Sequence, residues 1–352
     1  MKLLLLVSLW LMLPHLHSNA ATPAVQVSNI RRAFHNGEHN AFTDLVQFKG
    51  SLYLCFRSCP DGHMVFNSSS VIILHSGDEG KSWRQALRFS VPQRDTRDPH
   101  FLIFKDRLFV YTGTWWSGEG REERKDRDMN LMLGYAVHSA DGASWSNPIL
   151  LEGTFGSYIW RATSHGSRAY LCTRRKPHYE ALSRGEGEKV QALLLESEDG
   201  LVWRHRAYLN ESLGDETALL MDASGNLTAI GRNGSGGNAF LIRSRAPEFS
   251  PMNRQPLPRS IGGPLLATWG DRLLVGGRHQ VEGLGPKTSL CWLNGDNLEE
   301  FAQLPSGGDN SYPGFVALSP TRGLVSWYSS HEKDAQGKTI TAIYLADLSL
   351  RP

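Results

Sequence analysis

Short apolar stretches bounded by Gly, Asp and Asn recur along the whole chain, and no long stretch carries the 3.6-residue apolar period of an amphipathic helix. This pattern predicts an all-β protein. Six segments share one form, in which two short apolar strands flank a polar turn and a third apolar strand follows. These segments are 42–57, 98–113, 159–174, 215–232, 262–278 and 312–329.

The six turns recur at roughly 55-residue intervals, which is the size of one propeller blade. Three or four short antiparallel strands in each unit indicate a six-bladed β-propeller with four-stranded blades. We therefore predict that residues 21–352 form a single propeller domain. A two-sheet sandwich of the same length is the alternative, but it would not require a sixfold recurrence.

Three units carry a further signature after their third strand. It has the form S-x-D-x-G-x-x-W at 76–83 and is one residue shorter at 139–145 and 197–203. An Asp side chain accepts hydrogen bonds from turn amides, Gly takes the positive-φ position and Trp buries its ring between sheets. We interpret these turns as structural fasteners rather than as acids or metal ligands.

The first residues have the features of a targeting segment. Lys2 is followed by an apolar run over 3–14, and Ser18 and Ala20 supply small residues before a cleavage point. Residues 1–20 are therefore predicted to be a signal peptide, and the protein to be exported, either secreted or periplasmic. A retained anchor is the alternative, but the apolar run is short for a bilayer span, and no span is expected after cleavage.

The composition is that of an ordinary globular protein, 40% hydrophobic, with 37 Lys and Arg against 35 Asp and Glu. A net charge of +2 gives no field that would attract nucleic acid or anionic lipid. No motif indicates a nucleotide, flavin, haem or metal, so we predict no cofactor and a monomer. The four cysteines, at 55, 59, 172 and 291, are too few for a disulfide framework. Cys55 and Cys172 lie in apolar runs, as expected of buried free thiols.

Propeller geometry places the starts of first strands and the ends of second strands at one face of the molecule. Arginines occupy equivalent second-strand ends in four units: Arg57, Arg174, Arg232 and Arg278. Guanidinium groups that converge on one funnel repel each other, and an anionic ligand would relieve this because guanidinium binds carboxylate bidentately. Local pairing with Asp or Glu is the alternative. Trp115 and Trp116 lie at the same face, as a sugar platform or as blade packing.

First-strand starts add ionisable groups to this face. Carboxylates interleaved with arginines suggest both binding and acid–base chemistry, although adjacent pairs could simply neutralise one another. The residues are Asp44, Arg97 with Asp98, Trp160 with Arg161, Asp215 with Glu216, and Tyr312.

The Asp-box turns on a six-unit propeller resemble the sialidase (neuraminidase) superfamily over nearly the whole of 21–352. The resemblance implies a Tyr nucleophile activated by a Glu, because a carboxylate nucleophile would be repelled by the carboxylate on the anomeric carbon. By motif these residues are Tyr312 and Glu216. Asp61, or His63 in its place, matches the general acid, and Arg232 and Arg278 match two of three carboxylate-binding arginines.

This chain departs from the family where sialidases open the first hairpin with Arg-Ile-Pro, since it has Phe42-Thr43-Asp44 there. Arg57, Arg97, Arg161 or the pair Arg31-Arg32 could replace the missing arginine. We therefore predict a retaining exo-glycosidase that cleaves a terminal sialic-acid-like or other anionic sugar from a glycan. A non-catalytic acidic-glycan-binding propeller and a uronic-acid-directed hydrolase or lyase are the alternatives. The predicted substrate-binding set is Arg57, Arg97, Asp98, Arg161, Arg232, Arg278 and His63.

Overall fold

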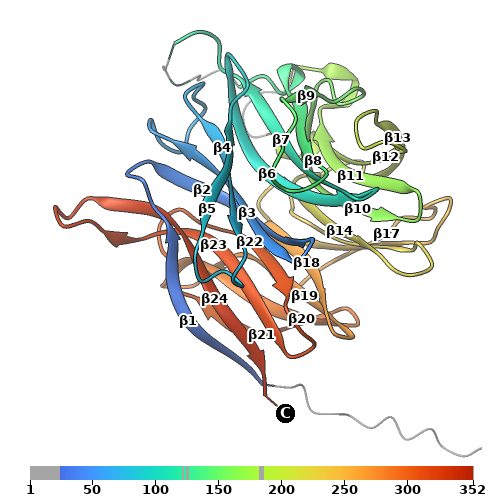
Figure 1. Cartoon of the computed structure of the whole chain (residues 1–352). Coiled ribbons are helices and arrows are strands. Elements are labelled where there is room, and N and C mark those ends of the chain that lie inside the picture. The colour runs from blue at the N-terminus through green and yellow to red at the C-terminus, as the bar shows by residue number, and fades with distance from the viewer. Residues whose placement is uncertain (1–23, 121–122, 124–126, 182–185, 352) are drawn as a thin grey trace, which may run out of the picture.

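The computed structural model describes residues 24–351 except 121–122, 124–126 and 182–185, so the predicted signal peptide over 1–20 lies outside the described residues. The described chain forms six four-stranded antiparallel sheets (Figure 1). Its only helical elements are short 3-10 segments, namely Met129–Leu131 (η1), Pro177–Tyr179 (η2) and Gly187–Lys189 (η3). The predicted six-bladed β-propeller is confirmed, and the two-sheet sandwich is excluded.

Each blade contains one predicted repeat. Blade 1 contains β2 (His39–Phe48), β3 (Ser51–Cys59), β4 (Ser70–Ser76) and β5 (Arg84–Phe89). Blade 2 contains β6 (Arg94–Phe104), β7 (Arg107–Trp116), β8 (Leu133–Ser139) and β9 (Ile149–Leu150). Blade 3 contains β10 (Ser157–His165), β11 (Arg168–Arg175), β12 (Gln191–Ser197) and β13 (Arg204–Asn210). Blade 4 contains β14 (Thr217–Met221), β15 (Leu227–Gly231), β16 (Phe240–Ser244) and β17 (Asn253–Pro256).

Blade 5 contains β18 (Gly262–Trp269), β19 (Arg272–Val281), β20 (Gly285–Asn294) and β21 (Asn297–Leu304). Blade 6 combines β22 (Asn310–Ala317), β23 (Arg322–Lys333) and β24 (Thr339–Leu350) with β1 (Val25–Phe34) from the other end of the chain. Figure 1 shows β1 alongside β24, and Val25 pairs with Leu350. This closure was not predicted, because β1 precedes the first repeat and carries no repeat signature.

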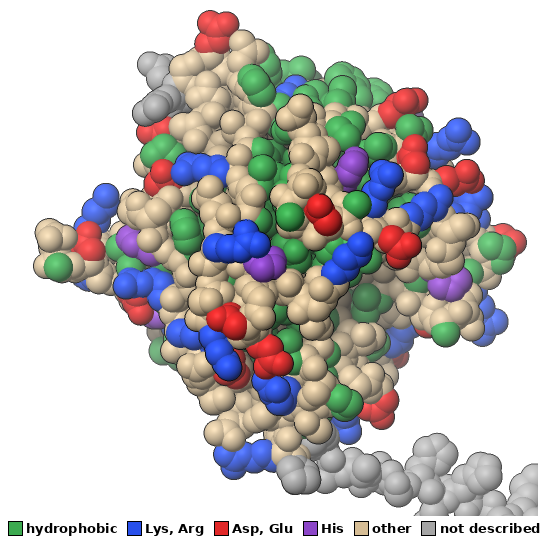
Figure 2. Space-filling model, viewed as in Figure 1, with side chains coloured by type: hydrophobic (Ala, Val, Ile, Leu, Met, Phe, Trp, Pro, Cys, Tyr) green, Lys and Arg blue, Asp and Glu red, His purple; other side chains and the backbone are tan. Residues whose placement is uncertain are grey.

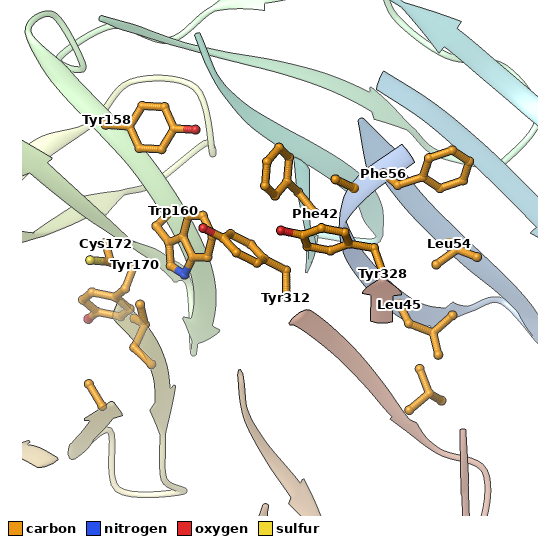
Figure 3. Packing of buried hydrophobic residues seen from close by; sticks show 14 of the residues in the cluster. Phe42, Leu45, Leu54, Phe56, Tyr158, Trp160, Tyr170, Cys172, Tyr312 and Tyr328 are labelled. Carbon is orange, nitrogen blue, oxygen red and sulfur yellow. The ribbon is translucent and has the colours of Figure 1, made fainter. Parts of the chain in front are cut away.

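The first strands of neighbouring blades contact one another in a closed ring around the propeller axis, from β2 through β6, β10, β14 and β18 to β22. Apolar side chains fill the spaces between the sheets. Figure 3 shows this packing near the axis, where Tyr312 lies between Trp160 and Tyr328. The ring of first strands therefore brings residues that are far apart in the sequence to one central position.

The Asp-box turns act as fasteners, as predicted. Asp141 accepts hydrogen bonds from the amides of Ala143 and Ser144 at 2.8 and 2.7 Å, and Asp199 makes equivalent bonds in blade 3. Strand register pairs Ser76, at the start of the first box, with Leu52, at the start of β3. The boxes therefore lie at the face opposite the second-strand ends.

All four cysteines are buried and unpaired, which confirms the prediction made for Cys55 and Cys172 from their apolar runs. No helix among the described residues is long and apolar enough to cross a lipid bilayer. Basic and acidic side chains are interspersed over the face shown in Figure 2, in agreement with the small net charge.

Candidate active site

A β-bulge recurs at the same place in the first strand of five blades. In each case three residues of the first strand span two residues of its partner, beginning at Ala41, Arg97, Ile159, Gly262 and Ser311. Four of the bulges contain a residue with positive φ: Phe42 at 63°, Asp98 at 53°, Gly263 at 59° and Tyr312 at 50°. Non-glycine residues rarely adopt this conformation, and such strain is characteristic of functional sites.

The bulges re-aim side chains toward a cavity of about 270 Å³ at the second-strand ends. A sequence signal accompanies three of the five, because proline follows the bulged residue in Asp98-Pro99, Gly263-Pro264 and Tyr312-Pro313. The cavity is lined by Phe42, His63, Met64, Val65, Arg97, Asp98, Trp115, Arg127, Tyr158, Arg174, Asp215, Glu216, Arg232, Arg278 and Tyr312.

Tyr312 and Glu216 form the central pair of this cavity. The Tyr312 hydroxyl donates a 2.6 Å hydrogen bond to Glu216 Oε1. Glu216 Oε2 accepts bonds at 3.0 Å from Arg232 Nη1 and from the amide of Gly263. Both carboxylate oxygens are thus held, and the phenol is aligned with a fixed acceptor for its proton.

The protonation states of the pair follow from its surroundings. Burial opposes ionisation of Glu216, but the charges of Arg232 and Arg174 and the bond from Tyr312 outweigh it and lower the pKa of the carboxyl. Burial, together with the negative charges of Glu216 and Asp98, raises the pKa of Tyr312 well above 10. At neutral pH the site therefore contains a neutral phenol beside a carboxylate that can receive its proton.

The Tyr312 ring is fixed by aromatic neighbours. Its centroid lies 4.9 Å from that of Phe42, 5.2 Å from Trp160 and 5.8 Å from Tyr328 (Figure 3). Thr43 fixes the backbone of Tyr312, because the Thr43 hydroxyl donates a 2.7 Å hydrogen bond to the Tyr312 carbonyl. The stretch at which the family resemblance implied Arg-Ile-Pro is thus occupied by buried residues, among which Thr43 holds the bulge of Tyr312.

Positive charge exceeds negative charge around the cavity, with five guanidinium groups against three carboxylates among its lining residues. Arg232 and Arg174 are partly neutralised by Asp215. Arg278 is freer, with one hydrogen bond to the Asn310 carbonyl at 3.1 Å and Asp309 at 3.9 Å. This imbalance, and the spare donors of Arg278, suit an anionic ligand.

Two arginines that the sequence placed against the ligand lie behind the cavity wall instead. Arg57 is fully buried, and Asp95 accepts from its Nε and Nη2 at 2.8 and 3.1 Å. Arg161 is bound by Asp44 and by the carbonyls of Pro264 and Pro313. The alignment of second-strand ends placed Arg57 at this face, and the position of Arg161 at a first-strand start placed that residue there as well. Neither pattern could reveal the acidic side chain that pairs with each guanidinium.

The remaining predicted residues are divided between the cavity and its exterior. Arg97 and Asp98 line it, with the Arg97 guanidinium 4.9 Å from the Phe42 ring centroid. His63 also lines it, whereas Asp61 is exposed outside it and binds Ser68. The pair Arg31-Arg32 lies on β1, where each residue contacts an acidic side chain of blade 6, so it does not reach the cavity.

Asp98 is the most unusual carboxyl among the lining residues. Its Oδ2 accepts from the Tyr158 hydroxyl, while the buried Oδ1 has no partner in the described structure. Burial raises the pKa of Asp98 to about 6, against the opposing charge of Arg97. An unpaired buried acceptor at a cavity wall is suited to a ligand hydroxyl.

Sequence reasoning left several lining residues without a role. Trp115 belongs to the wall and lies 5.8 Å from Tyr158, whereas Trp116 packs under Arg94. The alignment of second-strand ends included Arg174, and the structure places this residue in the lining of the cavity. Arg127 comes from the long connection between β7 and β8, which carries no periodic signal.

No family model matches the chain, and no curated protein matches it in sequence. Solved structures do match. A protein of unknown function from Dyadobacter fermentans is 23% identical, with a TM-score of 0.76, over 94% of this chain and 100% of that one. The Trypanosoma rangeli sialidase is 12% identical (TM-score 0.65), over 93% of this chain and 60% of that one.

The phage phi92 endosialidase is 10% identical, with a TM-score of 0.66, over 92% of this chain and 69% of that one. The chain shares the propeller fold of sialidases. At these identities the likeness shows the fold alone, and any function has to be argued from the site.

Proposed function

We propose that this protein is a retaining exo-glycosidase that releases a terminal sialic-acid-like or other anionic sugar from a glycan or glycoconjugate outside the cell. The observation that carries the proposal is the 2.6 Å hydrogen bond between the Tyr312 hydroxyl and Glu216 inside a cavity with excess guanidinium charge. Arg278, Arg232 and Arg174 would hold the sugar carboxylate, and the free oxygen of Asp98 would accept a sugar hydroxyl.

In the first half of the reaction, Tyr312 Oη attacks the anomeric carbon and its proton passes to Glu216. The bond from that carbon to the leaving oxygen breaks, and the oxygen takes up a proton from the enzyme. In the second half, the oxygen of a water molecule bonds to the anomeric carbon as the Tyr312–sugar bond breaks, and the phenol regains its proton from Glu216. The remaining proton of that water returns to the enzyme group that protonated the leaving oxygen. The arginines bind the sugar carboxylate and hold the anomeric carbon near Tyr312. A neutral phenol is a suitable nucleophile there, because the same sugar carboxylate would repel a carboxylate nucleophile.

The test is release of free sugar from aryl ketosides of N-acetylneuraminic acid and of 2-keto-3-deoxynononic acid, and from a mixed glycan pool. Tyr312→Phe should lose turnover by several orders of magnitude. Tyr111→Phe is the matched control, because that buried hydroxyl binds the Gly200 carbonyl at an Asp box, at the opposite face. Tyr312 Oη should displace the C2 fluoride of a 2,3-difluoro sugar, so that the peptide containing Tyr312 gains the mass of the sugar less that of hydrogen fluoride.

Three outcomes would contradict the proposal. Full activity of Tyr312→Phe would show that Tyr312 is not the nucleophile. Capture of acidic glycans without release of sugar would indicate the binding propeller, and an ultraviolet-absorbing unsaturated product would indicate a uronic-acid lyase.

A further inference from the structure

His63 stands at the mouth of the cavity, in the loop between β3 and β4. It lines the cavity, and 44% of its side chain is exposed. Its Nδ1 lies 2.6 Å from Asp309 Oδ2, so Nε2 is the ring nitrogen left to meet a ligand. A carboxylate on one imidazole nitrogen fixes the tautomer and stabilises the protonated ring, which is the arrangement of a general acid or base.

Two buried arginines hold the backbone on both sides of this histidine. Arg57 donates to the carbonyls of Gly62 and Met64, each at 2.9 Å, and Arg97 donates to the carbonyl of His63 itself at 3.1 Å. Asp95 binds both guanidinium groups. Three consecutive carbonyls of an exposed loop are therefore fixed from the interior. Loops are ordinarily mobile, so this anchoring gives the His63 ring a defined position.

Asp309 is the centre of a second set of contacts. Its Oδ2 also pairs with His39 Nε2 at 2.9 Å, and its Oδ1 accepts from the Tyr328 hydroxyl at 2.7 Å. Burial would favour the neutral acid, but the bonds to His39 and His63 outweigh it and hold the pKa of Asp309 well below its usual range. Asp309 therefore stays ionised, three residues before Tyr312 in the sequence.

His39, His63 and Asp309 are also the residue types that bind zinc, and their ligand atoms lie within 4.8 Å of one another. The distances argue against a metal. Two atoms bound to one tetrahedral zinc at about 2.0–2.1 Å stand roughly 3.3 Å apart. Asp309 Oδ2 lies 2.6 and 2.9 Å from the two imidazole nitrogens, which are hydrogen-bond lengths.

Position separates His63 from the two carboxyls that could do the same work. Asp61 lies outside the cavity, and Asp98 is buried in its wall against Tyr158. The leaving group of an exo-acting enzyme departs toward solvent, so its proton donor has to reach the mouth. Among the described residues that line the cavity, His63 is the exposed side chain at the mouth that can act as an acid or a base.

We propose that His63 is the general acid that protonates the leaving oxygen through Nε2, and that Asp309 is its positioning residue. This assignment rests on the proposed function. As the bond from the anomeric carbon to the leaving oxygen breaks, the Nε2 proton moves to that oxygen, and the ring becomes neutral. The oxygen of a water molecule then attacks the anomeric carbon as the Tyr312–sugar bond breaks. That water gives a proton to Nε2, which restores the imidazolium.

The test compares leaving groups of different acidity. On a ketoside of an alkyl alcohol or a second sugar, His63→Gln should lose about 10²–10⁴-fold in kcat/KM. On a ketoside of an acidic phenol, which leaves without a proton, the loss should be less than about tenfold, since general acid catalysis then contributes little. Asp61→Asn should match the unmodified enzyme on both substrates, and His138→Gln, beside an Asp box, is the matched control.

Asp309 has its own readout. Asp309→Asn should give the same leaving-group dependence as His63→Gln, and the double variant should be no worse than the worse single one. The charged or titratable groups in contact with His63 are Asp309, His39 and Arg97, with Tyr328 and Arg278 reaching it through Asp309.

Equal losses of His63→Gln on both substrates would overturn the assignment while leaving the Tyr312 mechanism intact. A leaving-group effect in Asp61→Asn would transfer the role to that residue. Loss of activity with a chelator and its recovery with zinc would replace the dyad by a metal site. Absence of any ketoside turnover by the unmodified protein would overturn the proposed function, and this assignment with it.

Discussion

Arg161 Nη1 lies 2.8 Å from Asp44 Oδ1, and this buried ion pair joins blade 3 to blade 1. The same guanidinium donates to Pro264 O in blade 5 at 3.0 Å and to Pro313 O in blade 6 at 2.7 Å. Asp44 in turn accepts from the Phe101 amide of blade 2. One side-chain pair therefore links the bulges of several blades and lies directly behind Tyr312.

We expect Arg161→Met to destabilise the protein by about 3–5 kcal/mol, because it leaves Asp44 buried without its charge partner. Urea unfolding measures this effect, and Asp44→Asn in the same chain should restore part of the loss. Arg322→Ala is the control, since its ion pair with Glu79 is exposed and should be worth less than about 1 kcal/mol. An unchanged free energy of unfolding in Arg161→Met would show that the ion pair does not hold the blades together.

The sequence predicted the blades well because each one repeats the same apolar–turn–apolar pattern. It also identified the face that holds the cavity, since that face follows from strand direction alone. It could not predict which side chains of neighbouring blades pair with one another. Arg57 and Arg278 occupy equivalent strand ends, yet Asp95 buries the first and a carbonyl holds the second. Which arginine remains free depends on side chains from another blade.

Asp309 was missed for a related reason. It lies in the Gly308–Gly314 stretch through which the family resemblance implied Tyr312, but its partners His39 and His63 come from the first blade. A sequence shows the neighbours of a residue along the chain, whereas the closed ring of first strands places blade 6 against blade 1. The single-residue bulges were equally hidden, apart from the prolines that follow three of them.

Gly263 should be required for activity because a side chain there would collide with Tyr312, in addition to the cost of placing a non-glycine residue at positive φ. A Cβ there would lie 2.5 Å from Tyr312 Cδ2, and the Gly263 amide binds Glu216. Gly263→Ala should therefore lower kcat by at least tenfold by displacing the ring. Gly166→Ala is the matched control, because φ there is +56° and a Cβ would meet nothing within 4 Å. If both variants retain full kcat, the ring tolerates displacement and its fixed position is not needed.

Arg278 should contribute to affinity through the carboxylate of the ligand. Its guanidinium donates to one neutral carbonyl and has no carboxylate within hydrogen-bond distance among the described residues, whereas Arg232 and Arg174 are each paired with an acidic side chain. Arg278→Ala should therefore weaken binding of a free 2-keto-3-deoxy sugar acid about 10–100-fold, the worth of a charge-assisted hydrogen bond. Calorimetry with the acid and with its methyl ester separates the charge from other contacts. An equal loss of affinity for the ester would mean that Arg278 does not bind the carboxylate.

Asp98 should make the stability of the protein depend on pH in the opposite direction to its other buried carboxyls. Its pKa is raised by burial to about 6 in the folded state, above the unfolded value near 3.8. Below about pH 4 the carboxyl is protonated in both states and does not lower the free energy of unfolding. As pH rises through 6, ionising Asp98 costs more in the folded state, so the free energy of unfolding falls. By contrast, Asp44, Glu216 and Asp309 have lowered pKa values and lose stability as pH falls through the acid range.

Asp98→Asn removes the first effect and leaves the others. The variant should gain stability over the unmodified protein between pH 4.5 and pH 7.5, by on the order of 1–3 kcal/mol, because about two pKa units correspond to at most about 3 kcal/mol. Urea midpoints at the two pH values measure the gain, and Asp106→Asn in an exposed turn controls for the change in net charge. A gain of the same size at both pH values would mean that Asp98 does not become harder to ionise on folding.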